Sequence, residues 1–301
     1  MKTTRIIPLL LSLSIGQALA DTPINVSHDA TPNVHVSISN VKGAVTVTAW
    51  DRNQVQVGGR LGDGAKPLAI EGSNSNMSIK VESQNGKSGW FNWNNENAMG
   101  STMLDIRVPK GASLDVDVVS APMSIDGIDG GKIKVNTVSG KARVNARTPL
   151  AEVDSVSGSI ELAGNADRVA LQTVSGDILA PNVGSEAELQ TVSGRIRVSG
   201  GPWRKLNLST VSGDVQLTGG TAPNGTFDVD SMSGDVQVQF PANTSATIHA
   251  STFSGDLRSD FGTARKVEHG PGSELQTTVG GGNGKINVET FSGDLRIRRQ
   301  D

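Results

Sequence analysis

The sequence contains no cysteine and no tyrosine, and aromatic residues make up only 3% of the chain. Without cysteine the protein can form no disulfide and no thiolate metal site, and it has no residue for lipoprotein acylation. The fold must therefore be held by burial and hydrogen bonding alone. A globular core of this size normally contains more aromatic side chains, so a repetitive architecture accounts for the composition better.

Long hydrophobic runs are also missing after the first twenty residues. Residues 1–20 have the features of a secretory signal peptide, because Lys2 and Arg5 precede an apolar stretch and Ala18-Leu19-Ala20 forms a small-x-small cleavage site. That stretch is too short to cross a bilayer, and no later segment approaches the ~20 apolar residues of a membrane helix. We expect export to the periplasm or the cell surface, with no membrane-spanning segment in the mature chain.

The chain also lacks an excess of positive charge, since its formal net charge is −3. Residues 1–20 hold two basic and no acidic residues, so their removal changes the formal net charge from −3 to −5. This charge argues against a nucleic-acid partner, since binding to phosphates requires a basic surface.

What the sequence does contain is a recurring four-residue tag of the type Thr-Val-Ser-Gly. Successive tag glycines are 18, 18, 18, 19, 21, 21 and 38 residues apart, which is typical of a repeat architecture. The last gap equals two repeats of 19 with one degraded tag. The glycines are Gly140, Gly158, Gly176, Gly194, Gly213, Gly234, Gly255 and Gly293.

Each repeat has the pattern strand, turn, strand, with alternating apolar and polar residues and no helix-period run. Stacked units can share one core that a single unit cannot form. We therefore predict an all-β fold, a β-solenoid of 18- to 21-residue repeats; a β-propeller with two units per blade stays open. The tag glycines should lie at equivalent turns. We also expect the apolar residues around one tag to be buried and to stack on their counterparts in the next repeat. The first group is Val169, Leu171, Val174 and Ile178, and it should stack on Leu189, Val192 and Ile196.

The repeats predict a single domain over residues 21–301. Its regular part covers 131–298, and less regular repeats cover 24–130. A loop insertion rich in Asn, Gly and Ser occupies 83–102 and carries Trp90, Phe91 and Trp93. These three rings are the candidate binding site for a glycan or protein, since exposed aromatic residues on loops often mark binding. The alternative is that they fold back and cover the solenoid.

Catalytic and metal-binding patterns are scarce. No histidine lies between His35 and His249, so no Ser-His triad can form within the central repeats. His249 and His269 have no metal-ligand spacing, and the Gly-rich segment 280–284 lacks the Gly-Lys-Ser/Thr ending of a phosphate loop. We predict no catalytic residues, no metal and no cofactor.

An Asp follows several tags, at Asp177, Asp214, Asp235, Asp256 and Asp294. In stacked coils these carboxylates would form a row that repels itself unless cations or backbone N–H groups compensate. A role in capping the turn is the favoured interpretation, because Lys141, Ser159 and Arg195 occupy the same place in other repeats.

The tags, the segment Gly43–Arg52 and the closing strand Thr290–Arg298 together resemble the bacterial DUF4097 family of adhesin-like β-repeat proteins. The resemblance covers nearly all of the mature chain and implies an exported envelope protein with no family catalytic residues. Two functions follow: an adhesin or scaffold that binds an envelope protein or glycan, and, as the alternative, a β-solenoid carbohydrate-active enzyme using surface carboxylates.

Overall fold

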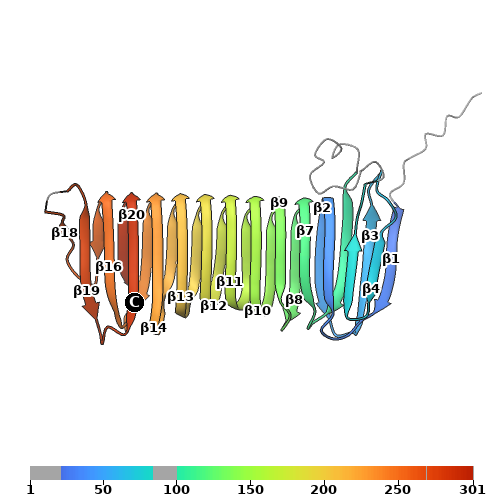
Figure 1. The fold of residues 1–301 in the computed structure, drawn as a ribbon, viewed down its shortest axis with the longest axis horizontal. Helices are drawn as coiled ribbons and strands as arrows, with labels where there is room; N and C mark the ends of the chain where they lie inside the picture. Colours follow the sequence, from blue (N-terminus) through green and yellow to red (C-terminus); the bar gives the residue numbers. More distant parts are fainter. Residues whose placement is uncertain (1–21, 84–99, 269, 301) are drawn as a thin grey trace, which may run out of the picture.

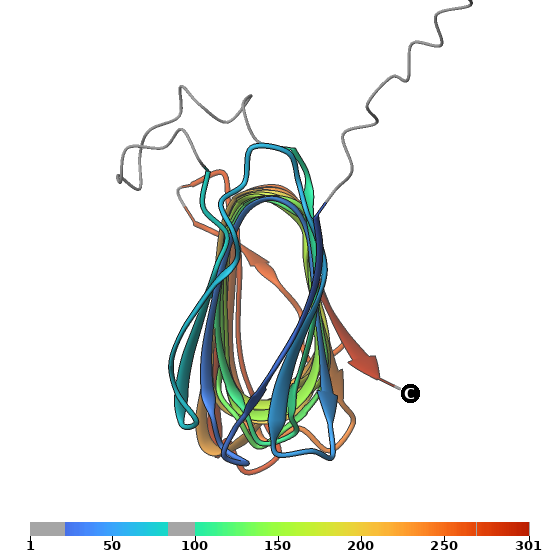
Figure 2. The same ribbon diagram turned by 90° about the vertical axis from the view of Figure 1, so that its right-hand side faces the viewer.

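The computed structural model describes residues 22–83, 100–268 and 270–300, and within them the chain forms strands and no helix. The strands lie side by side along one long axis (Figure 1). Viewed down that axis, they enclose a flattened oval with two long walls (Figure 2). The predicted β-solenoid is thus confirmed.

Five long strands form the regular centre of the solenoid. Each crosses one wall, bends, and crosses the other, and each pairs in parallel with the next through residues one repeat apart. Their bounds are β10 (Ala142–Ser157), β11 (Ile160–Ser175), β12 (Ile178–Ser193), β13 (Ile196–Ser212) and β14 (Val215–Ser233). The preceding coil is divided into β8 (Met123–Asp129) and β9 (Ile133–Ser139), which pair with the two halves of β10.

The tag glycines lie at equivalent turns of successive coils, as predicted. The N–H of Gly176 donates to the carbonyl of Ser193 over 3.0 Å, and the N–H of Gly194 donates to the carbonyl of Ser212 over 3.2 Å. Only glycine fits here, because a Cβ on Gly194 would lie 2.1 Å from the carbonyl oxygen of Gly176 in the coil below.

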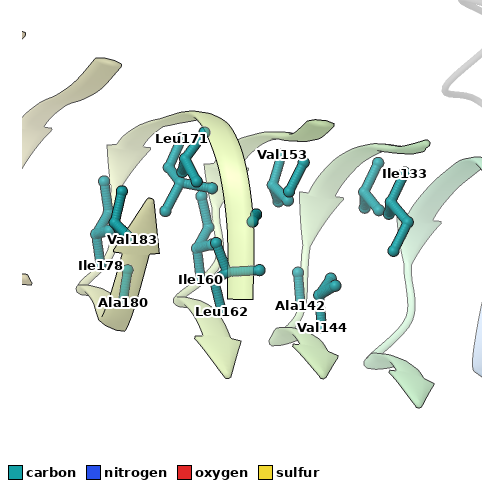
Figure 3. Close-up of a cluster of buried hydrophobic side chains, with 14 of the residues drawn as sticks. Ile133, Ala142, Val144, Val153, Ile160, Leu162, Leu171, Ile178, Ala180 and Val183 are labelled. Carbon is teal, nitrogen blue, oxygen red and sulfur yellow. The ribbon is translucent and has the colours of Figure 1, made fainter. Parts of the chain in front are cut away.

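Apolar side chains stack along the interior in rows, one residue per coil (Figure 3). Five members of the predicted set are buried: Val169, Leu171, Ile178, Leu189 and Ile196. The prediction was wrong for Val174 and Val192, which are 50% and 47% exposed. Strand alternation is the physical reason. Because Leu171 points inward, the inward residue of the tag is Thr173, and the valine that follows points to solvent.

The C-terminal end of the solenoid departs from chain order. Strand β20 inserts between β14 and β16 and pairs in parallel with both, and β21 likewise lies between β15 and β17. The segment before β20 forms β18 and β19, which run antiparallel at the edge. The gap of 38 residues between the last two tags therefore holds an edge hairpin and not a further coil. The bounds are β15 (Val236–Pro241), β16 (Ala246–Ser254), β17 (Leu257–Ser259), β18 (Arg265–Lys266), β19 (Ser273–Val279), β20 (Gly284–Ser292) and β21 (Leu295–Gln300).

The N-terminal end is built in the same way. Strand β2 lies between the coil of β5 and β6 and the coil of β7 and β8, and pairs in parallel with all four. Antiparallel strands β1, β3 and β4 complete this end. The N-terminal end therefore finishes in antiparallel strands, and the C-terminal end finishes in antiparallel β18 on one wall and parallel β17 on the other. The edge strands β17 and β18 are short, which limits edge-to-edge pairing. The bounds are β1 (Thr22–Asp29), β2 (His35–Trp50), β3 (Gln54–Leu61), β4 (Ala69–Ser73), β5 (Asn76–Lys80), β6 (Thr102–Pro109) and β7 (Ser113–Ser120).

Candidate functional site

The second residue of seven of the eight tags forms a continuous row of exposed apolar side chains along one edge of the solenoid. We call this row the apolar ladder. Its members are between 45% and 60% exposed, although every one of them is hydrophobic. In spatial order they are Val156, Val174, Val192, Val211, Met232, Phe291 and Phe253. Isolated surface hydrophobic residues are ordinary, but a contiguous stripe indicates an interaction surface.

The ladder changes character at its C-terminal end, where the valines give way to larger side chains. Phe253 and Phe291 stack with their ring centroids 4.8 Å apart and their planes inclined by 7°. This spacing equals that of hydrogen-bonded strands, because the rings come from adjacent coils. Met232 lies on the next coil beyond Phe291.

A groove of about 580 Å³ lies along this end of the ladder. Its floor includes Val211, Met232 and the two stacked rings, and the turn between β18 and β19 contributes Val267 and Pro271. A hydrogen bond of 3.0 Å from the Val267 N–H to the Gly272 carbonyl closes that turn. The volume is in the range of ligand pockets, so we call this feature the C-terminal groove and treat it as the candidate binding site.

Three carboxylates line the groove: Asp230, Glu289 and Glu274. Asp230 and Glu289 are direct partners in the parallel pair of β14 and β20, and Glu274 lies one strand beyond Ser251 on β19. No lysine or arginine is among the described residues that line the groove. The site therefore joins an apolar aromatic floor to a negatively charged side.

The row of Asp residues that follows the tags has a different role. The Asp214 carboxylate accepts the backbone N–H of Asp235 over 3.2 Å, and Asp235 in turn accepts that of Asp294 over 3.0 Å. Arg296 adds ion pairs of 3.5 Å to Asp235 and 2.8 Å to Asp294. The carboxylates thus bond backbone N–H groups of the next coil, which agrees with the capping role inferred from the sequence.

One carboxyl on the wall before the tags has a perturbed acidity. Burial raises the pKa of Asp154, the neighbouring charge of Glu152 raises it further, and Lys134 opposes the change. Glu152 forms an ion pair of 2.7 Å with Lys134. A raised carboxyl pKa beside a second carboxylate is one feature of glycoside hydrolases. However, Asp154 and Glu152 do not line the C-terminal groove, which weakens that interpretation.

No three His, Cys, Asp or Glu side chains are placed close enough together to hold a metal ion within residues 22–83, 100–268 and 270–300. The same part of the chain has no helix long and apolar enough to cross a membrane. The predicted site residues Trp90, Phe91 and Trp93 lie outside the described residues. Sequence reasoning missed the apolar ladder, although strand alternation through the tags would have indicated it.

The fold and the exposed ladder define a β-solenoid repeat protein with an apolar surface stripe. The Toastrack DUF4097 family model matches residues 33–298. The chain therefore belongs to the DUF4097 family, as the repeats had suggested. No curated protein matches the chain.

Solved structures share this architecture at low sequence identity. A "putative adhesin" from Parabacteroides merdae ATCC 43184 has a TM-score of 0.50 and 9% identity, over 92% of this chain and 99% of the other. A "putative lipid binding protein" from Parabacteroides distasonis ATCC 8503 has a TM-score of 0.46 and 12% identity, over 92% and 96% of the two chains. The first of these similarities supports the fold.

Proposed function

We propose that this protein is an exported, non-enzymatic interaction scaffold of the bacterial cell envelope, which adheres to an envelope protein or glycan through the apolar ladder and the C-terminal groove. The observation that carries the proposal is the ladder itself. Seven hydrophobic side chains on adjacent coils remain about half exposed, and two of them are stacked phenylalanines beside a groove. Burying such a stripe against a partner would be favourable at about 25 cal/mol per Å² of apolar surface removed from water.

Membership of the DUF4097 family and the name of the Parabacteroides merdae protein, a "putative adhesin", support an adhesin-like role. The signal-peptide features of residues 1–20 support export. Cell fractionation and the intact mass of the purified protein test this part of the proposal. Cleavage after Ala20 and recovery from the envelope or the medium are expected, whereas an uncleaved chain in the cytoplasm would contradict export.

Binding to envelope fractions tests the ladder directly. The double variant Phe253→Ser, Phe291→Ser removes the stacked pair, and binding measured by pull-down should fall at least about tenfold while the melting temperature changes little. The matched control is Val26→Ser, Met103→Ser, because these residues are 38% and 50% exposed but lie outside the ladder. Equal loss of binding in both double variants would count against the ladder as the binding surface.

The same assay tests the candidate binding site that the sequence predicts at Trp90, Phe91 and Trp93. A Trp90→Ala, Trp93→Ala variant should lose envelope or glycan binding and keep its melting temperature if these rings are a second binding site. A large fall in melting temperature, or unchanged binding, would show that the rings are structural.

The enzymatic alternative makes a separate prediction. If the groove carboxylates hydrolysed a polysaccharide, incubation with envelope glycans would release reducing ends, and Glu289→Gln would abolish that release. The binding proposal expects no release by either protein.

A further inference from the structure

The carboxylates of the C-terminal groove form a row across four neighbouring strands. Asp230 on β14 is the direct partner of Glu289 on β20, which pairs with Ser251 on β16, and Ser251 pairs with Glu274 on β19. Three strand spacings separate the two ends of the row, which corresponds to about 14 Å. The row therefore places three negative charges along one side of the groove.

Within the described residues, no cation is paired with this row. No ion pair or side-chain hydrogen bond there engages the carboxylates of Asp230, Glu274 and Glu289. The cation closest in register is Arg265, the β18 partner of Glu274, and it neither lines the groove nor forms an ion pair there. By contrast, the Asp row beyond the tags is bonded to backbone N–H groups and to Arg296.

Asp230 and Glu289 also oppose each other as like charges on adjacent coils. Such a directly facing pair destabilises a sheet unless a cation lies between its members. Each of these carboxylates comes two residues before a member of the apolar ladder, Met232 or Phe291. Since alternate residues of a strand share a face, the acidic row and the ladder run in parallel about 7 Å apart.

We propose that the C-terminal groove binds a basic, apolar polypeptide segment of a partner protein. Lysine or arginine side chains of the segment pair with Asp230, Glu289 and Glu274, and its apolar side chains pack on Met232 and the stacked rings. The inference rests on the proposed function and names the class of partner for the same surface. A neutral glycan would cover the rings but leave the carboxylates unpaired, and a zwitterionic lipid headgroup would bring only one cation to a row of three.

The binding of synthetic peptides to the purified full chain tests the proposal. A segment that follows the row needs at least about five extended residues. The probe is a fluorescent Leu-Lys repeat peptide of about eight residues, and matched Leu-Ser and Leu-Glu peptides serve as controls. Fluorescence anisotropy should show binding of the Leu-Lys peptide only. Its affinity should weaken as salt is raised from about 0.05 to about 0.5 M, because screening reduces exposed charge interactions.

Charge variants locate the interaction. The double variant Asp230→Asn, Glu289→Gln should bind the Leu-Lys peptide about tenfold more weakly. Its melting temperature should be equal or higher, since the like-charge contact is gone. The matched control, Asp63→Asn, Glu71→Gln, removes the same charge from exposed positions near the N-terminal end and should bind within about twofold of the parent protein.

Three results would overturn the inference: equal peptide affinity in both charge variants, equally tight binding of the Leu-Ser peptide, or binding of phosphatidylcholine vesicles or a neutral oligosaccharide without binding of the Leu-Lys peptide. Envelope binding by the Phe253→Ser, Phe291→Ser variant distinguishes failure of this inference from failure of the proposed function. If Phe253→Ser, Phe291→Ser loses envelope binding and the Leu-Lys peptide does not bind, the ladder is the binding surface and only the partner class is wrong. If envelope binding is unaffected, the proposed function itself is wrong.

Discussion

Three glycine substitutions can separate the two reasons for glycine in this solenoid, backbone conformation and close approach between coils. Gly130 has φ +101° and open space where a Cβ would lie. Gly158 needs no positive φ, but its Cβ would lie 2.0 Å from the carbonyl oxygen of Gly140. Gly194 combines both features, with φ +142° and a Cβ 2.1 Å from the Gly176 oxygen.

The expected costs follow from these geometries. In Gly130→Ala the only cost should be the backbone strain of a positive φ, which lowers the free energy of unfolding by about 1 to 2 kcal/mol. In Gly158→Ala the two coils must separate by more than 1 Å to restore an ordinary contact. This movement weakens hydrogen bonds between coils, such as the 3.0 Å bond from the Ala142 N–H to the Ser159 carbonyl. A cost of about 2 to 4 kcal/mol follows, and Gly194→Ala should cost about 3 to 6 kcal/mol.

Urea unfolding followed by circular dichroism would measure all three free energies of unfolding under one set of conditions. From most to least stable, the order should be wild type, Gly130→Ala, Gly158→Ala and Gly194→Ala. If Gly158→Ala lay within about 0.5 kcal/mol of the wild type, the coils would be able to separate freely at the tag. The explanation of the tag glycine by close approach would then be refuted.

Three further predictions concern single side chains. Val192→Ser should change the free energy of unfolding by less than about 0.5 kcal/mol, whereas Leu189→Ala on the same coil should cost about 2 to 5 kcal/mol; equal costs in chemical denaturation would contradict the observed alternation. Asp235→Asn should cost about 1 kcal/mol in the same assay, since its carboxylate accepts a backbone N–H and faces an arginine. The raised pKa of Asp154 means that its native carboxyl holds a proton more tightly than the unfolded one. The stability of the native protein should therefore fall as pH rises through that raised pKa. Asp154→Asn should be more stable than the wild type at neutral pH and equally stable in acid. Urea unfolding midpoints measured across this pH range test both expectations.

The architecture could be predicted from the sequence because the repeat and the coil are the same unit. A tag that returns every 18 or 19 residues places its glycine at the same turn each time, and the parallel pairing of Thr173 with Thr191 follows from that period alone. The order of the terminal coils could not be predicted. A repeat signal says that two segments are equivalent, but it does not say which segment lies beside which.

The error at Val174 has a local cause. The prediction followed the shared offsets of these residues from the tag glycines, which show that two positions are equivalent but not which face of the strand they occupy. Strand alternation decides otherwise, because Leu171 and Thr173 share a face and the valine between Thr173 and Ser175 must point away from it. Thr173 is accommodated inside by donating its hydroxyl to the Gly158 carbonyl over 3.3 Å.

The candidate site exists because the last coil is out of chain order. If β16 followed β14 directly, Met232 would adjoin Phe253, and Asp230 would adjoin Ser251. The insertion of β20 instead places Phe291 against Phe253, which creates the stacked pair, and places Glu289 against Asp230, which creates the like-charge pair. Both features therefore depend on one topological step. Neither is encoded in any single repeat, so the stacked pair and the like-charge pair are particular to the C-terminal groove, whereas the apolar ladder itself continues along the regular array.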